Sequence, residues 1–240
     1  MTTCTSPIIV ALDYSNVQEA LDSASKMDPS MCRVKVGKEL FTVGGPQVID
    51  ALMQKGFDVF LDLKYHDIPN TVAGACRAAT RQGAWMINVH AAGGRRMLQA
   101  AVEAVATNTA SGRQKPILIA VTMLTSMSAQ ELPEIGLEAN VEAVVSRYAQ
   151  LAFDAGLDGV VCSAQEARWL KSRFGVDFKL VTPGIRLPDD LKGDQSRVVT
   201  PLEAIKMGSD YLVIGRSITA ADDPIEALSK INQSLKVTHA

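Results

Sequence analysis

Residues 57–63 read FDVFLDL, and five of these seven side chains are apolar. A short run of this kind is typical of a β-strand, and its apolar content indicates that both of its faces are buried. Strands buried on both faces occur mainly in parallel sheets that are covered by helices. The run therefore indicates an α/β fold.

Seven similar runs are spread over the rest of the chain. They are IIVAL at 8–12, CRVKV at 32–36, WMINV at 85–89, PILIAV at 116–121, DGVVC at 158–162, FKLVT at 178–182 and DYLVIG at 210–215. Longer segments with helical periodicity separate them. For example, Val141, Val144, Val145 and Tyr148 fall on one face of a helix. The chain thus alternates between strands and crossover helices.

Residues that favour helix starts support these boundaries. A side-chain oxygen at the N-cap accepts hydrogen bonds from backbone N–H groups of the first turn, and a glutamate three residues later can bond back to the cap. Proline is favoured at the first helical position. Suitable residues are Asn16 with Glu19, Ser163 with Glu166, Thr200 with Pro201 and Glu203, and Asp223 with Pro224.

Eight strands that each lead into a helix predict a closed (β/α)8 TIM barrel. The alternative is an open, doubly wound sheet, which has the same alternation. A chain of 240 residues lies in the size range of one such barrel. Because no low-complexity segment, Gly/Pro-rich linker or further repeat interrupts the alternation, we expect one catalytic domain that comprises residues 1–240.

Composition limits the classes of partner. Hydrophobic residues make up 47% of the chain and charged residues 21%, which predicts a folded globule with a large core. The formal net charge of −2 gives no broad basic surface for nucleic acid, so we expect a small-molecule substrate held by a local site. The start, MTTCTSPIIVALD, has no signal-peptide pattern, and no run is long enough to span a membrane. We therefore expect a cytoplasmic protein without a membrane partner.

The cysteines and histidines do not indicate a metal site. The cysteines are far apart in sequence, with no CxxC pair or Cys/His cluster, and we expect all of them to be reduced: Cys4, Cys32, Cys76 and Cys162. His66 and His239 are expected to be solvated. His90 ends a strand, where it is either a hydrogen-bonded barrel residue, which we favour, or a weak contributor to the site.

Charged residues gather at the ends of the first three predicted strands. Asp13 follows the first strand, Lys35 lies near the end of the second, and Asp62, Lys64 and Asp67 lie at the end of the third. The C-terminal ends of barrel strands carry the active site in this fold. A solvated surface cluster is the alternative, but convergence of four of these charges, those of Asp13, Lys35, Asp62 and Lys64, on one barrel mouth favours a catalytic site.

Lys64 is the residue best placed for chemistry. Asp62 and Lys64 are two residues apart on a strand, so both side chains should point into the barrel mouth. The neighbouring carboxylates favour the charged ammonium form of the lysine. This argues against Schiff-base chemistry, which needs a lysine that loses its proton, and favours a lysine that acts as a charged acid.

A second cluster follows the last two strands, where barrels often bind phosphate. TPGIR at 182–186 and YLVIGRS at 211–217 contain glycines that allow close backbone approach, and Arg216 can bind phosphate through two hydrogen bonds. Two ordinary turns are the alternative. The long stretch at 187–199 contains GDQ at 193–195 and could fold over the phosphate as a lid.

These residues resemble those of orotidine 5′-phosphate decarboxylases of the bacterial type, and the resemblance covers essentially the whole chain. The matching motifs, in order, are VALD at 10–13, KVGKELF at 35–41, DxKxxDIPNT at 62–71, VTMLTS at 121–126, TPGIR at 182–186, GDQ at 193–195 and VIGR at 213–216. The resemblance implies decarboxylation of orotidine 5′-phosphate to UMP, the last step of de novo pyrimidine nucleotide synthesis. It implies no cofactor and no metal.

The resemblance also implies roles for individual residues. It implies a charged catalytic array of Lys35, Asp62, Lys64 and Asp67. The implied substrate-binding residues are Asp13 and Lys35 at the ribose, Thr125 and Ser126 near the pyrimidine, and Pro183, Arg186, Gln195, Gly215 and Arg216 toward the phosphate. It further implies a homodimer in which Asp67, Ile68 and Thr71 reach into the partner's site.

Two other functions fit parts of the pattern. DxKxxD also occurs in magnesium-dependent decarboxylases and aldolases of sugar phosphates on the same barrel, but these relatives generally have an acidic metal ligand where this chain has Lys35. A catalytically silent nucleotide-binding protein or metabolite sensor would keep the phosphate site. It would have little reason to keep Asp62, Lys64 and Asp67.

Overall fold

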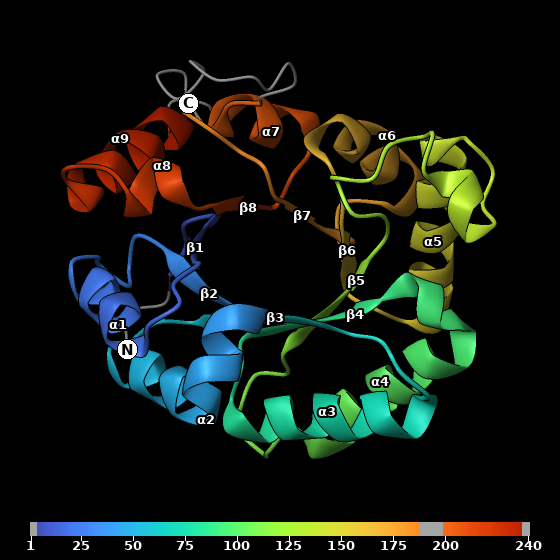
Figure 1. The fold of residues 1–240 in the computed structure, drawn as a ribbon, viewed down its shortest axis with the longest axis horizontal. Helices are drawn as coiled ribbons and strands as arrows, with labels where there is room; N and C mark the ends of the chain where they lie inside the picture. Colours follow the sequence, from blue (N-terminus) through green and yellow to red (C-terminus); the bar gives the residue numbers. More distant parts are fainter. Residues whose placement is uncertain (1–3, 188–198, 237–240) are drawn as a thin grey trace.

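The computed structural model describes residues 4–187 and 199–236, and in this part of the chain eight parallel strands close into a barrel (Figure 1). The strands are β1 (Ile8–Leu12), β2 (Arg33–Gly37), β3 (Val59–Tyr65), β4 (Met86–His90), β5 (Ile117–Val121), β6 (Gly159–Val161), β7 (Lys179–Thr182) and β8 (Tyr211–Ile214). Each strand pairs with the next along the chain, and β8 pairs with β1. The predicted barrel is confirmed, and the open sheet is excluded because its edge strands would stay unpaired.

A ring of helices surrounds the barrel (Figure 1). The α-helices are α1 (Val17–Ser25), α2 (Lys38–Gln54), α3 (Pro69–Gln82), α4 (Gly94–Asn108), α5 (Val141–Ala155), α6 (Ala164–Phe174), α7 (Pro201–Met207), α8 (Arg216–Thr219) and α9 (Pro224–Lys236). The described residues also form the short 3-10 helices η1 (Ala91–Gly93) and η2 (Leu132–Ile135). The apolar faces of the helices pack on the barrel and form the larger of two cores.

The alternation of side chains along each strand separates the two cores. In β3, Val59 and Leu61 belong to the core between barrel and helices, whereas Phe60 belongs to a smaller cluster inside the barrel. Ile9 and Met86 join Phe60 in that inner cluster. Successive side chains of a strand point to opposite faces, so the residues after Phe60 at every second position must also point inward. In this way the sequence directs Asp62 into the barrel.

The predicted helix caps are confirmed. The Asn16 side chain accepts hydrogen bonds from the backbone N–H groups of Gln18 and Glu19. Reciprocal capping boxes start α6 (Ser163 with Glu166) and α7 (Thr200 with Glu203). At the start of α9, one side-chain oxygen of Asp223 accepts hydrogen bonds from the backbone N–H groups of Ile225 and Glu226. These local bonds fix where each helix begins and therefore how long each strand-to-helix loop is.

Two turns at the N-terminal end of the barrel share the same arrangement, a glycine that ends a helix followed two residues later by an aspartate that binds the neighbouring strand. Gly156 ends α5 with φ 87°, a left-handed conformation that favours glycine, and Asp158 then accepts a 2.7 Å hydrogen bond from the N–H of Leu118 in β5. After α7, the same Gly-x-Asp spacing places Asp210 2.7 Å from the N–H of Leu180 in β7. Each aspartate therefore satisfies an N–H group of the neighbouring strand.

The N-terminal end of the barrel interior is closed by Arg33. Its guanidinium carbon lies 4.3 Å from the centre of the Trp85 ring, its nitrogens donate to the carbonyl groups of Cys4 and Ser6, and Nε lies 3.3 Å from an Asp58 oxygen. The cation, which is buried, is compensated by stacking, hydrogen bonds and an opposite charge. Arg33 and Trp85 thus fill this end of the barrel interior among the described residues.

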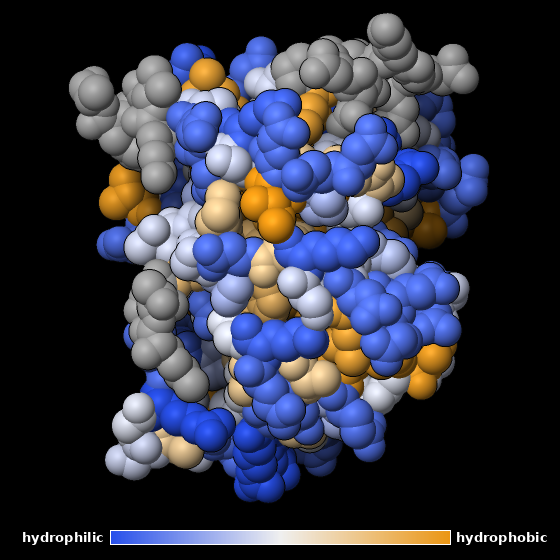
Figure 2. All heavy atoms as spheres, turned by 90° about the vertical axis from the view of Figure 1, so that its left-hand side faces the viewer, coloured by the Kyte–Doolittle hydropathy of each residue, from blue (hydrophilic) through white to orange (hydrophobic). Residues whose placement is uncertain are grey.

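One face of the molecule is mainly polar. Figure 2 shows the face that carries α1, α8 and α9, where hydrophilic side chains cover most of the surface and hydrophobic ones are scattered. The buried residues of α1 are Ala20, Ser23 and Ala24, which lie on the side turned to the barrel. Among the described residues, no helix has the length and apolar content that crossing a membrane requires.

Candidate active site

A cavity of about 250 Å³ lies at the C-terminal end of the barrel. Its apolar floor comes from inward side chains of the strands, and its walls come from charged residues and from the turns after β7 and β8. The lining residues are Ala11, Asp13, Lys35, Phe60, Asp62, Lys64, Val161, Val181, Pro183, Gly184, Val213 and Gly215. An apolar pocket with a few convergent polar groups is the usual form of a small-molecule site.

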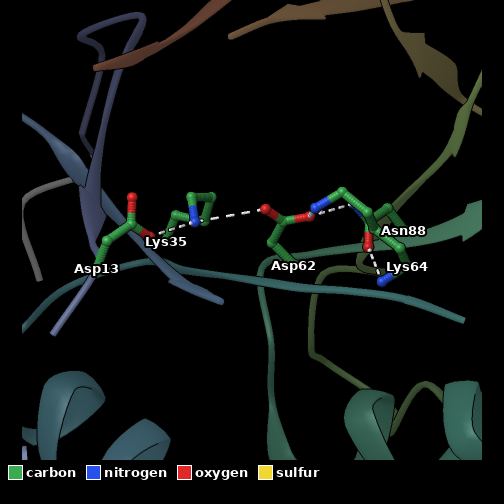
Figure 3. A network of polar contacts seen from close by, with 5 residues as sticks. All are labelled: Asp13, Lys35, Asp62, Lys64 and Asn88. Carbon is green, nitrogen blue, oxygen red and sulfur yellow. Dashed lines mark hydrogen bonds and ion pairs between the residues drawn. The ribbon is translucent and has the colours of Figure 1, made fainter. Parts of the chain in front are cut away.

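Four charged side chains form a row along one wall of this cavity (Figure 3). Lys35 Nζ lies 3.1 Å from Asp13 Oδ1 and 3.4 Å from Asp62 Oδ2, and Lys64 Nζ lies 2.6 Å from Asp62 Oδ1. The row therefore alternates in sign, from Asp13 through Lys35 and Asp62 to Lys64. The prediction that these four residues converge on the barrel mouth is confirmed.

Burial makes the pairing within this row important. The side chains of Lys35 and Asp62 are only 9% and 12% exposed, so each charge needs an opposite partner close by. Two carboxylates and two ammonium groups give the row no net charge. Lys35 already supplies a cation between the two carboxylates. Lys64, at the end of the row and 26% exposed, keeps N–H donors that Asp62 does not use.

The backbone at Lys64 differs from the regular strand that we expected. Lys64 has φ 52°, and it is the only residue other than glycine with a positive φ among the described residues. The pairing of β3 with β4 is irregular here: Leu61 pairs with Ile87, but the next paired residue is Tyr65, opposite Val89. Three residues of β3 thus lie opposite Asn88 alone. The alternation of Asp62 and Lys64 toward one face holds, but through a bulge rather than a regular strand.

Asn88 is a site residue that the sequence analysis missed. It is fully buried, accepts a 2.7 Å hydrogen bond from the backbone N–H of Lys64, and donates a 2.6 Å hydrogen bond to Asp62 Oδ1 (Figure 3). The signal in the sequence is a single amide within the apolar strand WMINV. Inward polar residues in such strands must find partners, so an amide at this position is a signal of a polar site.

Asp67, Ile68 and Thr71 lie apart from the charged row. All three are exposed, and one Asp67 oxygen accepts a 2.6 Å hydrogen bond from the N–H of Ile68 at the start of α3. Within one chain, the described residues show no hydrogen bond or ion pair between Asp67 and Lys64. The prediction of a catalytic role for Asp67 therefore depends on the partner subunit that the resemblance implies.

Only some of the residues predicted to bind the base and the phosphate line the cavity in the described part of the chain. Pro183 and Gly215 line the cavity, as does Gly184. Arg186 is partly buried and Arg216 is exposed. Thr125 and Ser126 are exposed in the segment after β5, and the cavity lining among the described residues includes neither of them. Gln195 and the rest of the predicted lid, including GDQ at 193–195, lie outside the described residues.

His90 ends β4 close to the row, where its ring lies 5.5 Å from that of His66. Burial, together with smaller effects of the nearby His66, Lys38 and Lys64, lowers the pKa of His90 to about 4. The described residues give its ring no hydrogen-bond partner, so the interpretation as a hydrogen-bonded barrel residue is not supported. His90 is therefore a neutral imidazole at neutral pH.

This depressed pKa predicts acid sensitivity. The folded protein binds the imidazole proton more weakly than the unfolded chain, so acid favours unfolding. Stability due to His90 should fall as the pH drops from about 6.5 to about 4, by at most about 1.4 kcal/mol per pH unit. Urea unfolding at pH 7, 6 and 5 should show a smaller loss in His90→Gln than in the unmodified protein. Equal losses in both proteins would contradict this assignment.

The four cysteines are buried and free, as predicted. Burial raises the pKa values of the Cys32 and Cys76 thiols to about 12, and that of Cys162 well above the ordinary value. Such thiols stay protonated and unreactive. In residues 4–187 and 199–236, no three His, Cys, Asp or Glu side chains are grouped so that they could hold a metal ion.

The sequence matches the profile of one protein family from residue 6 to residue 231. The chain belongs to the orotidine 5′-phosphate decarboxylase / HUMPS family. The family resemblance inferred from the motifs is thereby confirmed. Membership agrees with the site, in which the DxKxxD motif of the family supplies two of the four charges in the row, Asp62 and Lys64.

Similar proteins carry the decarboxylase name. The chain is 58% identical over 233 residues to the orotidine 5′-phosphate decarboxylase of Chromobacterium violaceum, with 97% of this chain and 93% of that protein covered. It is 57% identical to the protein of the same name from Laribacter hongkongensis, with 97% and 94% covered. These relatives are named as enzymes that break a carbon–carbon bond.

Solved structures share the fold. The crystal structure of orotidine 5′-phosphate decarboxylase from Lactobacillus acidophilus has a TM-score of 0.86 and 40% sequence identity, covering 96% of this chain and 99% of that one. An uncharacterized conserved protein from Geobacillus kaustophilus has a TM-score of 0.84 and 44% identity, covering 95% and 100%. The family barrel thus extends over nearly the whole chain.

Proposed function

We propose that this protein decarboxylates orotidine 5′-phosphate to UMP without a cofactor, and that Lys64 is the catalytic acid. The observation that carries the proposal is the ammonium group of Lys64, held 2.6 Å from Asp62 in the wall of the cavity. The names of the relatives support the substrate. The alternating row supports the mechanism, because it holds the partly buried Lys64 cation at a fixed place within a row that has no net charge.

The chemistry needs a fixed cation more than an electron sink. When the bond between C6 and the carboxyl carbon breaks, CO₂ leaves and the electron pair stays on C6 in an orbital in the plane of the ring. That pair cannot spread into the ring's π system. The Lys64 ammonium would stabilise the negative charge and then transfer a proton to C6, which forms UMP and leaves a neutral amine that solvent reprotonates.

Asp62 and Lys35 would keep this lysine charged and in place. Asp62 accepts from the Lys64 ammonium and also pairs with Lys35, which in turn pairs with Asp13. A preorganised row of this kind does not have to rearrange when charge develops on the substrate. Asp13 and Lys35 would also contact the ribose hydroxyl groups, since both line the cavity.

The phosphate would bind beside the turns after β7 and β8. Pro183, Gly184 and Gly215 line the cavity at this point, and Arg216 follows Gly215 directly. Although the phosphate lies far from the bond that breaks, its contacts can align the reacting end of the substrate. This proposal gives Arg216 a role in both binding and turnover.

Replacement of Arg216 should therefore weaken both steps. Arg216→Ala removes a bidentate, charge-assisted contact, so we expect UMP affinity and kcat/KM to fall together by roughly 10- to 100-fold, equivalent to about 1.4–3 kcal/mol. Arg168→Ala, an arginine of α6, is a matched control and should have little effect. Unchanged steady-state kinetics in Arg216→Ala would rule out the phosphate assignment.

We propose further that the active protein is a homodimer with shared sites. Asp67, Ile68 and Thr71 are exposed in one chain, and the apolar Ile68 side chain is 67% exposed. This exposure leaves the three side chains accessible to a second subunit, as the family resemblance implies. Asp67 of each subunit would then approach Lys64 of the other.

We also propose a cytoplasmic location, which the four free cysteines support, because thiols stay reduced in the cytoplasm. Recovery of the protein in the secreted fraction of cells would contradict this location.

The direct test of the function is to add orotidine 5′-phosphate in the presence of EDTA and follow ultraviolet absorbance, since loss of the carboxylate changes the pyrimidine chromophore. We expect full activity without added metal. Loss of activity with EDTA, restored by Mg²⁺, would favour a magnesium-dependent sugar-phosphate enzyme on the same barrel. No conversion under any condition, with tight UMP binding, would favour a nucleotide sensor.

A further inference from the structure

Asn88 occupies a special position relative to the charged row. It belongs to β4, points into the barrel, and lies alone opposite the three residues of β3 between the pairs Leu61–Ile87 and Tyr65–Val89. Regular pairing is lost over this bulge, so backbone groups of β3 need other partners. The Asn88 side chain supplies one, for the N–H group of Lys64.

The orientation of the Asn88 amide is fixed by its two partners. The backbone N–H of Lys64 can only donate, so the atom 2.7 Å from it must be the amide oxygen. An ionised Asp62 carboxylate can only accept, so the atom 2.6 Å from Oδ1 must be the amide nitrogen. Few other side chains offer a donor and an acceptor at this spacing.

The bond to the backbone matters because Lys64 is strained. A residue with a Cβ atom is strained in the left-handed region, and this conformation persists only if neighbouring contacts hold it. Lys64 has φ 52°, and Asn88 binds its N–H. The same amide donates to the Asp62 oxygen that binds the Lys64 ammonium. One buried side chain thus holds both ends of the Asp62–Lys64 pair.

We infer that Asn88 is a positioning residue for the decarboxylation: it fixes the backbone of Lys64 and the carboxylate of Asp62 so that the ammonium is directed at C6 of the substrate. Asn88 acts through Asp62 and Lys64, since the cavity lining among the described residues does not include it. The inference rests on the proposed function and adds a residue to it. The competing interpretation is that Asn88 only fills space in the barrel.

Asn88→Leu tests the inference, because leucine has a similar size but neither donates nor accepts. Asn88→Ala is the second variant in case leucine does not fit. Thr80→Val is the matched control: it removes another buried side-chain hydrogen bond, from Thr80 Oγ1 to the Cys76 carbonyl in α3, far from the cavity. For each protein, kcat, UMP affinity and the number of UMP sites per chain are measured, together with exchange of the C6 proton of UMP into D₂O.

In Asn88→Leu or Asn88→Ala we expect kcat and the C6 exchange rate to fall together by about 100-fold, the effect of misplacing a reacting group by about 1 Å. UMP affinity should stay within about threefold, and the number of sites should remain one per chain. Thr80→Val should match the unmodified protein. A space-filling role would instead lower the number of UMP sites and the apparent kcat in proportion.

Two results would overturn the inference. The first is a folded Asn88 variant whose kcat lies within about threefold of the unmodified protein, and the second is a loss of kcat that equals the loss of UMP sites. If the unmodified protein itself fails to convert orotidine 5′-phosphate, the proposed function fails and the inference fails with it. Activity of the unmodified protein therefore separates the two cases.

Discussion

Lys64→Ala protein is expected to bind UMP but to decarboxylate almost no orotidine 5′-phosphate. The substitution removes the cation that would stabilise the C6 carbanion and the acid that would protonate it. A positioned acid is worth about 10²–10⁴-fold and one electrostatic donor about 10²–10³-fold, so turnover should slow by about 10⁴-fold or more. Each tenfold step corresponds to about 1.36 kcal/mol of lost transition-state stabilisation.

Product binding separates this effect from misfolding. UMP lacks the carboxylate, and most of its proposed contacts are with the ribose and phosphate, so its dissociation constant should change little. Lys115→Ala is the matched control, because Lys115 also pairs with an aspartate, Asp158 at 2.8 Å, but at the N-terminal end of the barrel. It should turn over substrate as fast as the unmodified protein. Near-normal turnover in Lys64→Ala would disprove the assignment of the catalytic acid.

The parts of the fold that follow from short-range patterns could be predicted. All eight runs, of five to seven residues each, contain strands, because a short apolar run between amphipathic helices is buried on both faces in a parallel sheet. Capping residues such as Asn16 and Ser163 mark helix starts through bonds within three residues. The position of Asp13, Lys35, Asp62 and Lys64 then follows from the barrel, which brings strand ends together.

What could not be predicted depends on contacts between distant residues. The left-handed backbone of Lys64 needs Asn88, which lies 24 residues later. A propensity argument assigns lysine to a regular strand, because nothing near it in sequence favours a positive φ. Likewise, the buried Arg33 is explained by Trp85, Asp58 and the carbonyl groups of the N-terminal segment, all of them distant in sequence.

Asp67 shows a second limit of prediction from the sequence, which concerns the site that a residue serves. The DxKxxD spacing places it three residues after Lys64, yet the turn into α3 directs it away from the row, and its carboxylate binds the N–H of Ile68 instead. Sequence spacing identifies the residue but not the site that it serves. One chain alone leaves two arrangements: Asp67 serves the cavity of its own subunit after a movement of the loop, or it serves the cavity of a partner.

Pairing of variant subunits should decide between these arrangements. We expect Asp67→Ala alone to be nearly inactive, since the resemblance places this carboxylate beside the ammonium of Lys64. A purified heterodimer of one Lys64→Ala subunit and one Asp67→Ala subunit should regain about half of the unmodified activity per dimer. In a symmetric dimer with crossed sites, one of its two sites contains an intact Lys64 and an intact Asp67.

The reciprocal pairing provides the control. A heterodimer of an unmodified subunit and a subunit with both Lys64→Ala and Asp67→Ala has no complete site if Asp67 crosses the interface, because the intact Lys64 then faces the altered partner. If Asp67 serves its own subunit, this heterodimer keeps one complete site and the first heterodimer has none. The two arrangements thus predict opposite results in the same pair of measurements, and half activity in the second heterodimer would exclude the shared site. A protein that stays monomeric at assay concentrations would exclude it as well, since no partner would then supply the carboxylate.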